Sequence, residues 1–201
     1  MEIFTLFALV AIVAYVVKSK DQKRRIALLA SHLGKYQIDK LMESLTTGYA
    51  RALGETSPER QTQVWNHLNS TEAALREQFS RFATGFAQVD EADARVSLFP
   101  VALPYADKIF PHATFDLRKA LAIHANGIGL TANIDHPQTP KEKAFVLSAE
   151  MMLMRHTCHW FCRSKIVASA RMLSQHKTSY EQLLAAVSPD TRKAYLALIA
   201  P

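Results

Sequence analysis

The sequence predicts an all-α protein in which a single N-terminal membrane-anchor helix precedes a bundle of about six helices. An uncharged apolar run over residues 3–17 stands directly before a basic cluster. Only six Gly and eight Pro occur in 201 residues, a composition that favours helices over strands and turns. A hydroxyl residue followed by Pro, which is typical of a helix start, occurs at Ser57-Pro58, Thr139-Pro140 and Ser188-Pro189.

The apolar run, IFTLFALVAIVAYVV from Ile3 to Val17, predicts a membrane anchor over residues 1–18. A helix over residues 1–17 is about 25 Å long, whereas the hydrocarbon core of a bilayer is near 30 Å thick. A snorkelling Lys18 side chain or local thinning of the bilayer then completes the span. A cleavable signal peptide carries its positive charge before the apolar run, whereas here Glu2 precedes it. The alternatives are a buried core helix and a segment packed against a partner subunit.

The net charge of +6 is concentrated just after the apolar run. Five basic residues against one aspartate give +4 within residues 18–25, while the chain from residue 26 onward carries only +3. The five predicted membrane-boundary residues are Lys18, Lys20, Lys23, Arg24 and Arg25. Such clusters meet anionic headgroups and stay inside, which predicts an outer N-terminus and a cytoplasmic domain at a membrane, most simply the inner membrane of a bacterium. The small net positive charge of the chain from residue 26 onward argues against nucleic-acid binding.

The body divides into a basic juxtamembrane segment with a connecting helix, over residues 19–56, and a helical domain over residues 57–201. The apolar face of the connecting segment shifts at Gly34, which predicts a kink or break there. From Val64 to Val89 apolar residues recur in steps of three and four, which predicts a long helix with a narrow apolar seam. We expect this seam to pack inside the bundle; a coiled coil with another chain is the alternative.

Three prolines interrupt an apolar stretch between Ser97 and Pro111, so no long helix fits there. We expect this stretch to pack over the core, because exposed apolar patches are rare without a function. The alternative is a surface that contacts a protein partner or the bilayer. The candidate partner-binding residues are Phe99, Tyr105 and Phe110, and the Val64–Val89 seam is a second candidate docking element.

Capping signals place the remaining helices. The acidic residues 90–93 suit a solvated turn and helix start. Helices are then expected from about residue 116 to 128, from 140 to about 175, from 180 to 187, and from 189 to 199.

Soft metal donors gather in the longest predicted helix, at Met154, Cys158, His159 and Cys162. On a helix these residues are one turn apart, so several donors could converge on copper, zinc or haem iron. The same Met and Cys positions also form one apolar face, and their spacing matches neither paired CxxC motifs nor CxxCH. We favour core residues and free thiols, with no cofactor, and keep a metal or haem site as the alternative.

The first functional hypothesis is a non-enzymatic adaptor or accessory protein that binds a protein partner at the membrane, and the second is the metal or haem protein. The sequence contains no GxSxG, HExxH, glycine-rich phosphate loop or nucleotide fingerprint, which lowers the expectation of an enzyme. We interpret His124 as a core histidine and Glu150 as salt-bridged or water-facing. A helical enzyme built on these two residues is a third hypothesis.

Overall fold

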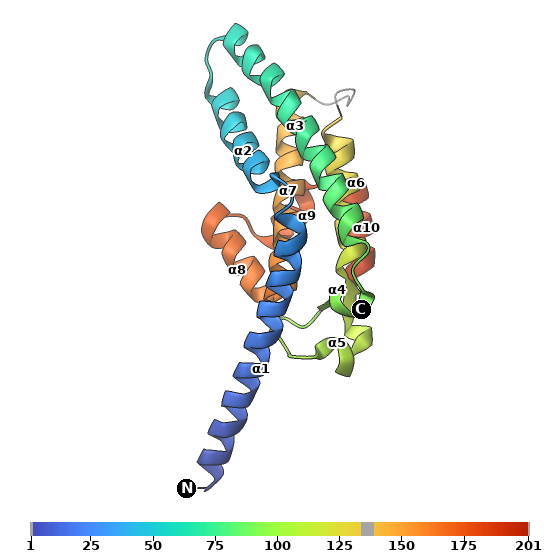
Figure 1. The fold of residues 1–201 in the computed structure, drawn as a ribbon. Helices are drawn as coiled ribbons and strands as arrows, with labels where there is room; N and C mark the ends of the chain where they lie inside the picture. Colours follow the sequence, from blue (N-terminus) through green and yellow to red (C-terminus); the bar gives the residue numbers. More distant parts are fainter. Residues whose placement is uncertain (1, 134–138, 201) are drawn as a thin grey trace.

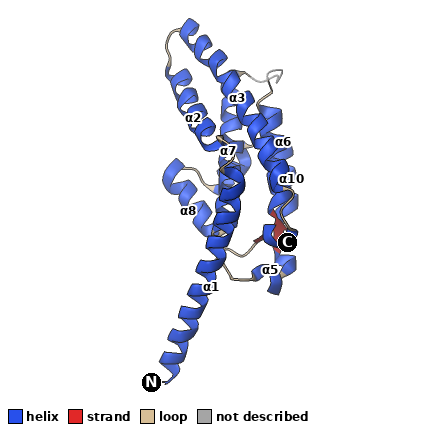
Figure 2. Cartoon of the chain, viewed as in Figure 1, coloured by secondary structure: helices blue, strands red, loops and turns tan. Residues whose placement is uncertain are grey.

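The computed structural model describes residues 2–133 and 139–200, and most of them are helical (Figures 1 and 2). The six helices of eleven or more residues after the first are α2 (Ile38–Gly54), α3 (Pro58–Phe86), α6 (Leu117–Thr131), α7 (Pro140–Cys162), α8 (Lys165–His176) and α10 (Pro189–Ile199). The short elements are α4 (Glu91–Ala94), α5 (Ala106–Ile109), the 3-10 turn η1 (Pro111–Ala113) and α9 (Tyr180–Ala186). The all-α prediction, with one N-terminal apolar helix, is confirmed.

Helix α1 (Glu2–Leu33) is a single uninterrupted helix of 32 residues with two different surroundings. Its first half projects from the domain (Figure 1), and Phe4 is 83% exposed. Its second half packs against α7 and α3, and Leu29 is 6% exposed. The helix ends at Leu33 and α2 begins at Ile38, so the break falls at Gly34 as the shift of the apolar face predicts.

The apolar seam of α3 forms the centre of the bundle. Its side chains pack against α2 and α6, and the buried members are Leu68, Leu75, Phe79, Phe82 and Phe86. This confirms intramolecular packing of the seam. A docking role for the seam does not fit these five residues, because side chains buried between α2, α3 and α6 offer little surface to another protein, whereas Val64 at the start of the seam is half-buried.

The helix starts predicted from hydroxyl-Pro pairs are confirmed. Ser57 accepts a hydrogen bond from the Arg60 N–H and Ser188 from the Thr191 N–H. Thr139 and Glu142 form a reciprocal capping box at the start of α7. Each cap satisfies backbone donors that the first helical turn leaves free, which explains why a local signal suffices to place these helices.

Two features differ from the sequence prediction. The helix expected from residue 140 to about 175 is divided into α7 and α8, because Ser164 adopts an extended backbone and its hydroxyl accepts from the Val167 N–H as a new cap. A short antiparallel ribbon was not predicted: β1 (Arg95–Ser97) pairs with β2 (Thr114–Asp116), with Val96 opposite Phe115. An alternating apolar pattern cannot be recognised in the sequence when a strand has only three residues.

A buried ion pair joins α2, α3 and α7. The Lys143 ammonium lies 2.5 Å from the Glu72 carboxylate, and both side chains are at most 10% exposed. The Tyr49 hydroxyl donates to the second carboxylate oxygen at 2.7 Å. Burial, and then the charge of Glu72, raise the pKa of Tyr49, so the phenol stays protonated as the donor.

Replacing Lys143 by Met should lower the free energy of unfolding by about 3–5 kcal/mol, because it leaves the Glu72 carboxylate buried without its cation. Chemical unfolding of the full-length protein in detergent, followed by circular dichroism, measures the change. Lys141→Met is the matched control, since Lys141 is exposed on the same helix and its loss should cost under about 0.5 kcal/mol. Equal stability of the two variants would contradict the ion pair's role.

Candidate functional site

The exposed half of α1 is the first candidate site. Its large apolar side chains, from Ile3 to Val16, lie open on all sides of the helix. Among the described residues, α1 is the one helix long and apolar enough to cross a membrane, judged by length and composition, and none of its most apolar window is buried. A helix that is apolar and exposed on all sides is typical of a segment that needs an apolar solvent.

The five basic residues after this half are divided by the structure. Lys18, Lys20 and Lys23 are exposed. Arg24 instead turns toward the domain and its guanidinium lies 2.6 Å from the carboxylate of Asp93, which belongs to α4. Both partners of that ion pair are about half exposed, so it contributes little stability but marks the side of α1 that faces the domain.

Arg25 lies inside the protein rather than at its surface, with a side chain only 11% exposed. Its guanidinium lies 2.9 Å from the carboxylate of Asp21 and donates to the carbonyl oxygen of Arg95 at 2.7 Å. It also lies 3.8 Å from Asp107 and 5.2 Å above the ring of Phe161. These contacts give Arg25 a structural role in joining α1 to β1 and α5, which the sequence alone does not indicate.

The second candidate site is the segment between the two strands, residues 98–113, which we name the proline loop. Tyr105 and Phe110 are about half exposed and Phe99 is half-buried. Three further apolar side chains are also exposed, namely Val101, Leu103 and Ile109. The expectation that this stretch packs over the core is wrong for these residues, because the prolines limit the helix α5 to four residues and no continuous apolar face forms.

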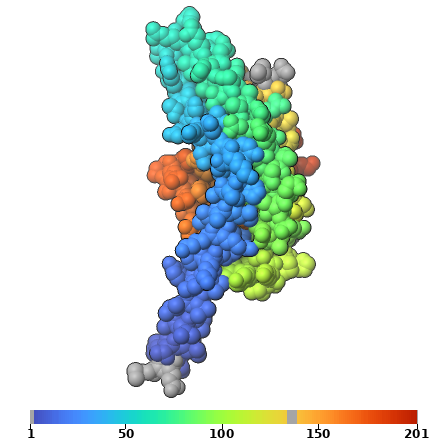
Figure 3. Space-filling view, in the orientation of Figure 1, coloured from blue at the N-terminus to red at the C-terminus, as the bar shows by residue number. Residues whose placement is uncertain are grey.

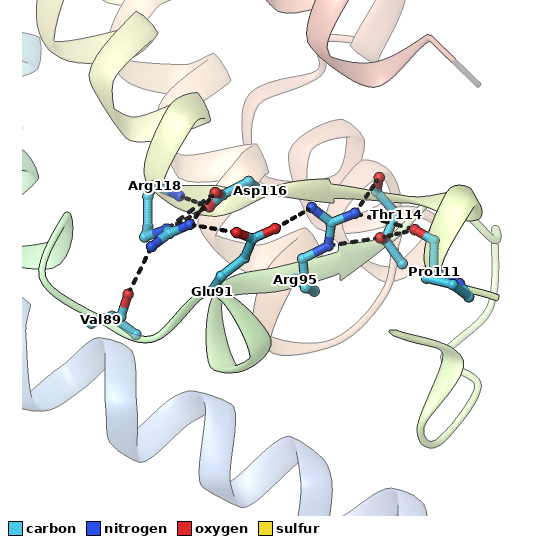
Figure 4. A network of polar contacts seen from close by, with 7 residues as sticks. All are labelled: Val89, Glu91, Arg95, Pro111, Thr114, Asp116 and Arg118. Atoms are coloured by element: carbon cyan, nitrogen blue, oxygen red, sulfur yellow. Dashed lines mark hydrogen bonds and ion pairs between the residues drawn. The ribbon is translucent and has the colours of Figure 1, made fainter. Parts of the chain in front are cut away.

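A polar network fixes the base of the proline loop (Figure 4). Arg95 donates to the Thr114 hydroxyl at 2.9 Å and to the Pro111 carbonyl at 3.1 Å. Arg118 bridges Asp116, at 2.7 Å, and Glu91, at 3.3 Å. Burial alone would raise the pKa of Asp116, but the hydrogen bonds from Arg118 hold it below its usual range.

A third candidate is an open groove of about 390 Å³ between α1, α2, α7 and α8, which we name the α1–α7 groove. Most of its apolar lining comes from Ile26, Leu29 and Leu33 on α1 and from Met154, Cys158 and Cys162 on α7, and Ile38 at the start of α2 adds to it. Its polar rim consists of Asp39, Arg155, His159, Arg163 and Arg171. Three arginines against one aspartate give this groove a positive rim around an apolar floor.

The predicted metal donors Met154, Cys158, His159 and Cys162 all line the α1–α7 groove. The Cys158 and Met154 sulfurs lie 3.8 Å apart, while His159 turns its Nδ1 to Arg171 at 3.4 Å. No group of three or more His, Cys, Asp or Glu side chains suited to a metal occurs within residues 2–133 and 139–200. Burial raises the pKa of Cys162 to about 11 and also raises that of Cys158, so both side chains are protonated thiols near neutral pH in the metal-free protein.

His124 lies in the core, as its position on an apolar face predicts. Its Nε2 is 3.0 Å from the Thr157 hydroxyl, which in turn contacts the Tyr195 hydroxyl at 2.9 Å. A second histidine, His156, is also fully buried; its ring stacks on Tyr180 and its Nε2 is 3.0 Å from the Ser169 hydroxyl. No separate pattern marks His156 in the sequence, where it lies among the Met and Cys residues of α7.

Glu150 is neither salt-bridged nor water-facing, so that interpretation is wrong. It is fully buried and accepts a hydrogen bond from the Ser188 N–H at 3.1 Å, at the start of α10. A Cβ at position 127 would lie 2.6 Å from its carboxylate, so Gly127 provides the space for this side chain. Because Glu150 and His124 are both closed off from solvent, the pair offers no surface to a substrate.

Comparisons of this chain with protein-family models, with curated proteins and with solved structures each found no match. Its function is therefore inferred from its own residues and geometry. The candidate binding surfaces are the exposed half of α1, the proline loop and the α1–α7 groove.

The two buried histidines predict a loss of stability in acid. Burial lowers the pKa of His124 to about 3 and that of His156 to about 4, against 6.5 when unfolded. Below about pH 6.5 the unfolded chain therefore binds more protons at these sites, and each imidazole lowers stability by up to about 1.4 kcal/mol per pH unit until its folded pKa is reached. Glu150 acts in the opposite sense, because burial raises its pKa.

Comparison of variants isolates the histidine effect. Between about pH 7 and about pH 5, the double variant His124→Gln/His156→Gln should lose roughly 2–4 kcal/mol less stability than the unaltered protein, as measured by chemical unfolding at both pH values. His67→Gln is the control, because His67 is exposed and should leave the pH dependence unchanged. A double variant with the original pH dependence would show that the two imidazoles do not cause it.

Proposed function

We propose that this chain is a single-pass membrane protein, with an outer N-terminus and a helical domain on the cytoplasmic face of a bacterial inner membrane, that acts as an adaptor or accessory protein for a protein partner. The observation that carries the proposal is the continuity of α1, which is exposed and apolar in its first half and packed into the domain in its second. A tether of this kind raises the effective concentration of the domain at the membrane, so even weak contacts become useful.

The charge distribution supports the orientation. Lys18, Lys20 and Lys23 are exposed on the domain side of the apolar half, where the positive-inside rule places basic residues. Anionic headgroups attract such residues by about 1 kcal/mol each. The domain that follows them is therefore on the cytoplasmic side in this proposal.

The α1–α7 groove is the surface that best fits a protein partner. An apolar floor suits the apolar face of a helix, and the rim arginines Arg155, Arg163 and Arg171 suit acidic residues beside that face. We therefore infer an acidic amphipathic helix as the class of partner. The aromatic residues of the proline loop, predicted to bind a partner, do not line this groove.

The alternative function, a metal or haem protein, has less support. Its donors lie on the groove floor, but no group of three or more His, Cys, Asp or Glu side chains suited to a metal occurs within residues 2–133 and 139–200. The sulfur atoms of Met154 and Cys158 also contribute normally to an apolar surface.

Anchoring is tested by fractionation of cells that express the full chain. The protein should stay with membranes after an alkaline wash, and Leu9→Lys/Ile12→Lys should release it, because each charge at the centre of a span costs about 2.5–3.5 kcal/mol. Leu53→Lys/Leu130→Lys is the matched control, since both residues are exposed and apolar but lie outside α1. A wild-type protein that washes off, or a C-terminal reporter that is exported, would refute the proposal.

Partner binding is tested by affinity purification from native membranes with mass spectrometry. Arg155→Glu/Arg171→Glu should reduce recovery of an acidic partner at least about tenfold, because like charges across an interface cost several kcal/mol. Arg192→Glu/Lys193→Glu, on the exposed side of α10, should leave recovery unchanged. The groove is not the binding surface if both double variants recover the same proteins in equal amounts.

A further inference from the structure

We propose that the proline loop inserts apolar side chains into the membrane interface beside α1, so that the domain itself makes a second contact with lipid. This inference rests on the proposed membrane anchoring of α1. The side chains concerned lie within residues 101–110 and are 42–64% exposed: Val101, Leu103, Tyr105, Ile109 and Phe110. An apolar cluster of this kind on a protein surface marks a contact site.

The loop lies at the end of the domain from which the exposed half of α1 projects. Figure 1 shows α5 at this end, with the loop that leads to it running toward α1, and the space-filling view in Figure 3 shows the same part of the chain against the helix. A small cavity of about 30 Å³ separates them, lined by Lys18 and Asp21 of α1 and by Val101 and Leu103 of the loop. The loop is therefore level with the residues that follow the apolar run.

The length of the apolar run brings this end of the domain close to the bilayer. Residues 3–17 cover about 22 Å as a helix, less than the roughly 30 Å of a hydrocarbon core. The residues around Lys18 must then lie at the edge of the core or slightly within it, and the Lys18 side chain reaches the headgroups by snorkelling. Side chains level with Lys18 lie in the interfacial layer, where aromatic residues such as Tyr105 are favoured.

The charges of the loop agree with a lipid surface. Asp107 is the one acidic residue of the proline loop, and its side chain is only 10% exposed because it faces Arg25. The exposed charge is Lys108, whose ammonium lies 5.2 Å from the Tyr105 ring. Anionic headgroups would therefore contact the Lys108 ammonium and apolar side chains, while the Asp107 carboxylate faces the protein.

The loop is also fixed before it meets a membrane. The network around Arg95 and Arg118 holds its base (Figure 4), and the Trp160 indole donates to the Ser97 carbonyl at 2.9 Å. The rings of Phe99 and Phe110 pack edge to face at 5.3 Å and join the two sides of the loop. Little conformational entropy is lost on insertion when the apolar side chains are already held in place.

Fluorescence quenching in vesicles tests this inference on the full-length chain. A cysteine-free background, Cys158→Ala/Cys162→Ala, carries a single cysteine labelled with an environment-sensitive fluorophore in place of Phe7, Ile109 or Phe145. The vesicles contain phosphatidylcholine with a minority of phosphatidylglycerol and lipids with a shallow nitroxide quencher. Phe145 is the matched control, because it is as exposed as Ile109 but lies about 22 Å along α7 from Trp160, which contacts the base of the loop.

The label at Ile109 should lose about half of its fluorescence, because an inserted side chain lies about 5–10 Å below the headgroups, while the label at Phe145 should keep its intensity. Quenching at Phe7 without quenching at Ile109 would overturn the loop contact and leave the anchor intact. That outcome would return the loop to the role of a protein-binding surface. Absence of quenching at Phe7 as well would overturn the proposed anchoring itself. Circular dichroism of each labelled variant verifies that the helical fold is retained.

Discussion

The contacts of the Arg25 guanidinium determine how the two halves of the molecule are related. A nearly buried arginine must satisfy its N–H groups within the protein, and here the partners come from α1 itself, from β1 and from α5. Because α1 is one uninterrupted helix, these contacts fix both the rotation and the height of its exposed half relative to the domain. A flexible linker after the apolar run would leave that relation open, whereas a helix held by Arg25 defines which end of the domain faces the bilayer in the proposed orientation.

The parts of the fold that the sequence predicts correctly depend on local signals. A hydroxyl residue before Pro satisfies free backbone donors within one turn, so Ser57, Thr139 and Ser188 mark helix starts whatever surrounds them. The seam of α3 is similarly readable, because its apolar residues recur with the helical period over most of its length. The break at Gly34 follows from the same periodicity, since a shifted apolar face cannot bury both segments on one straight helix.

The parts that were missed depend on contacts between residues far apart in the chain. Arg24 and Arg25 look like boundary cations in the sequence, and only the contacts in the structure show that Arg24 faces Asp93 of the domain and that Arg25 joins α1 to β1 and α5. Glu150 was misjudged because its partner, the Ser188 N–H, lies 38 residues away. A Cβ at Gly127 of α6 would meet the Glu150 carboxylate, but the sequence does not distinguish this glycine from Gly129 of the same helix, where a Cβ would meet nothing within 4 Å. For the candidate sites, the Met and Cys residues were correctly assigned to an apolar face, but the sequence could not show that α1 leaves this face open as a groove.

The α1–α7 groove and the proposed anchor share one helix, and this has a consequence for partner binding. Ile26, Leu29 and Leu33 form one wall of the groove, about 12–23 Å along α1 from Lys18. A partner helix seated there would lie within a few turns of the membrane surface, at a height fixed by the helix rather than by a linker. The positive rim of the groove would then lie next to the anionic surface of the membrane. That surface attracts cations and repels acidic segments that are free in solution. Binding of an acidic helix in this position is therefore favoured most for a partner that is itself held at the membrane, because tethering offsets the repulsion that a soluble competitor must overcome.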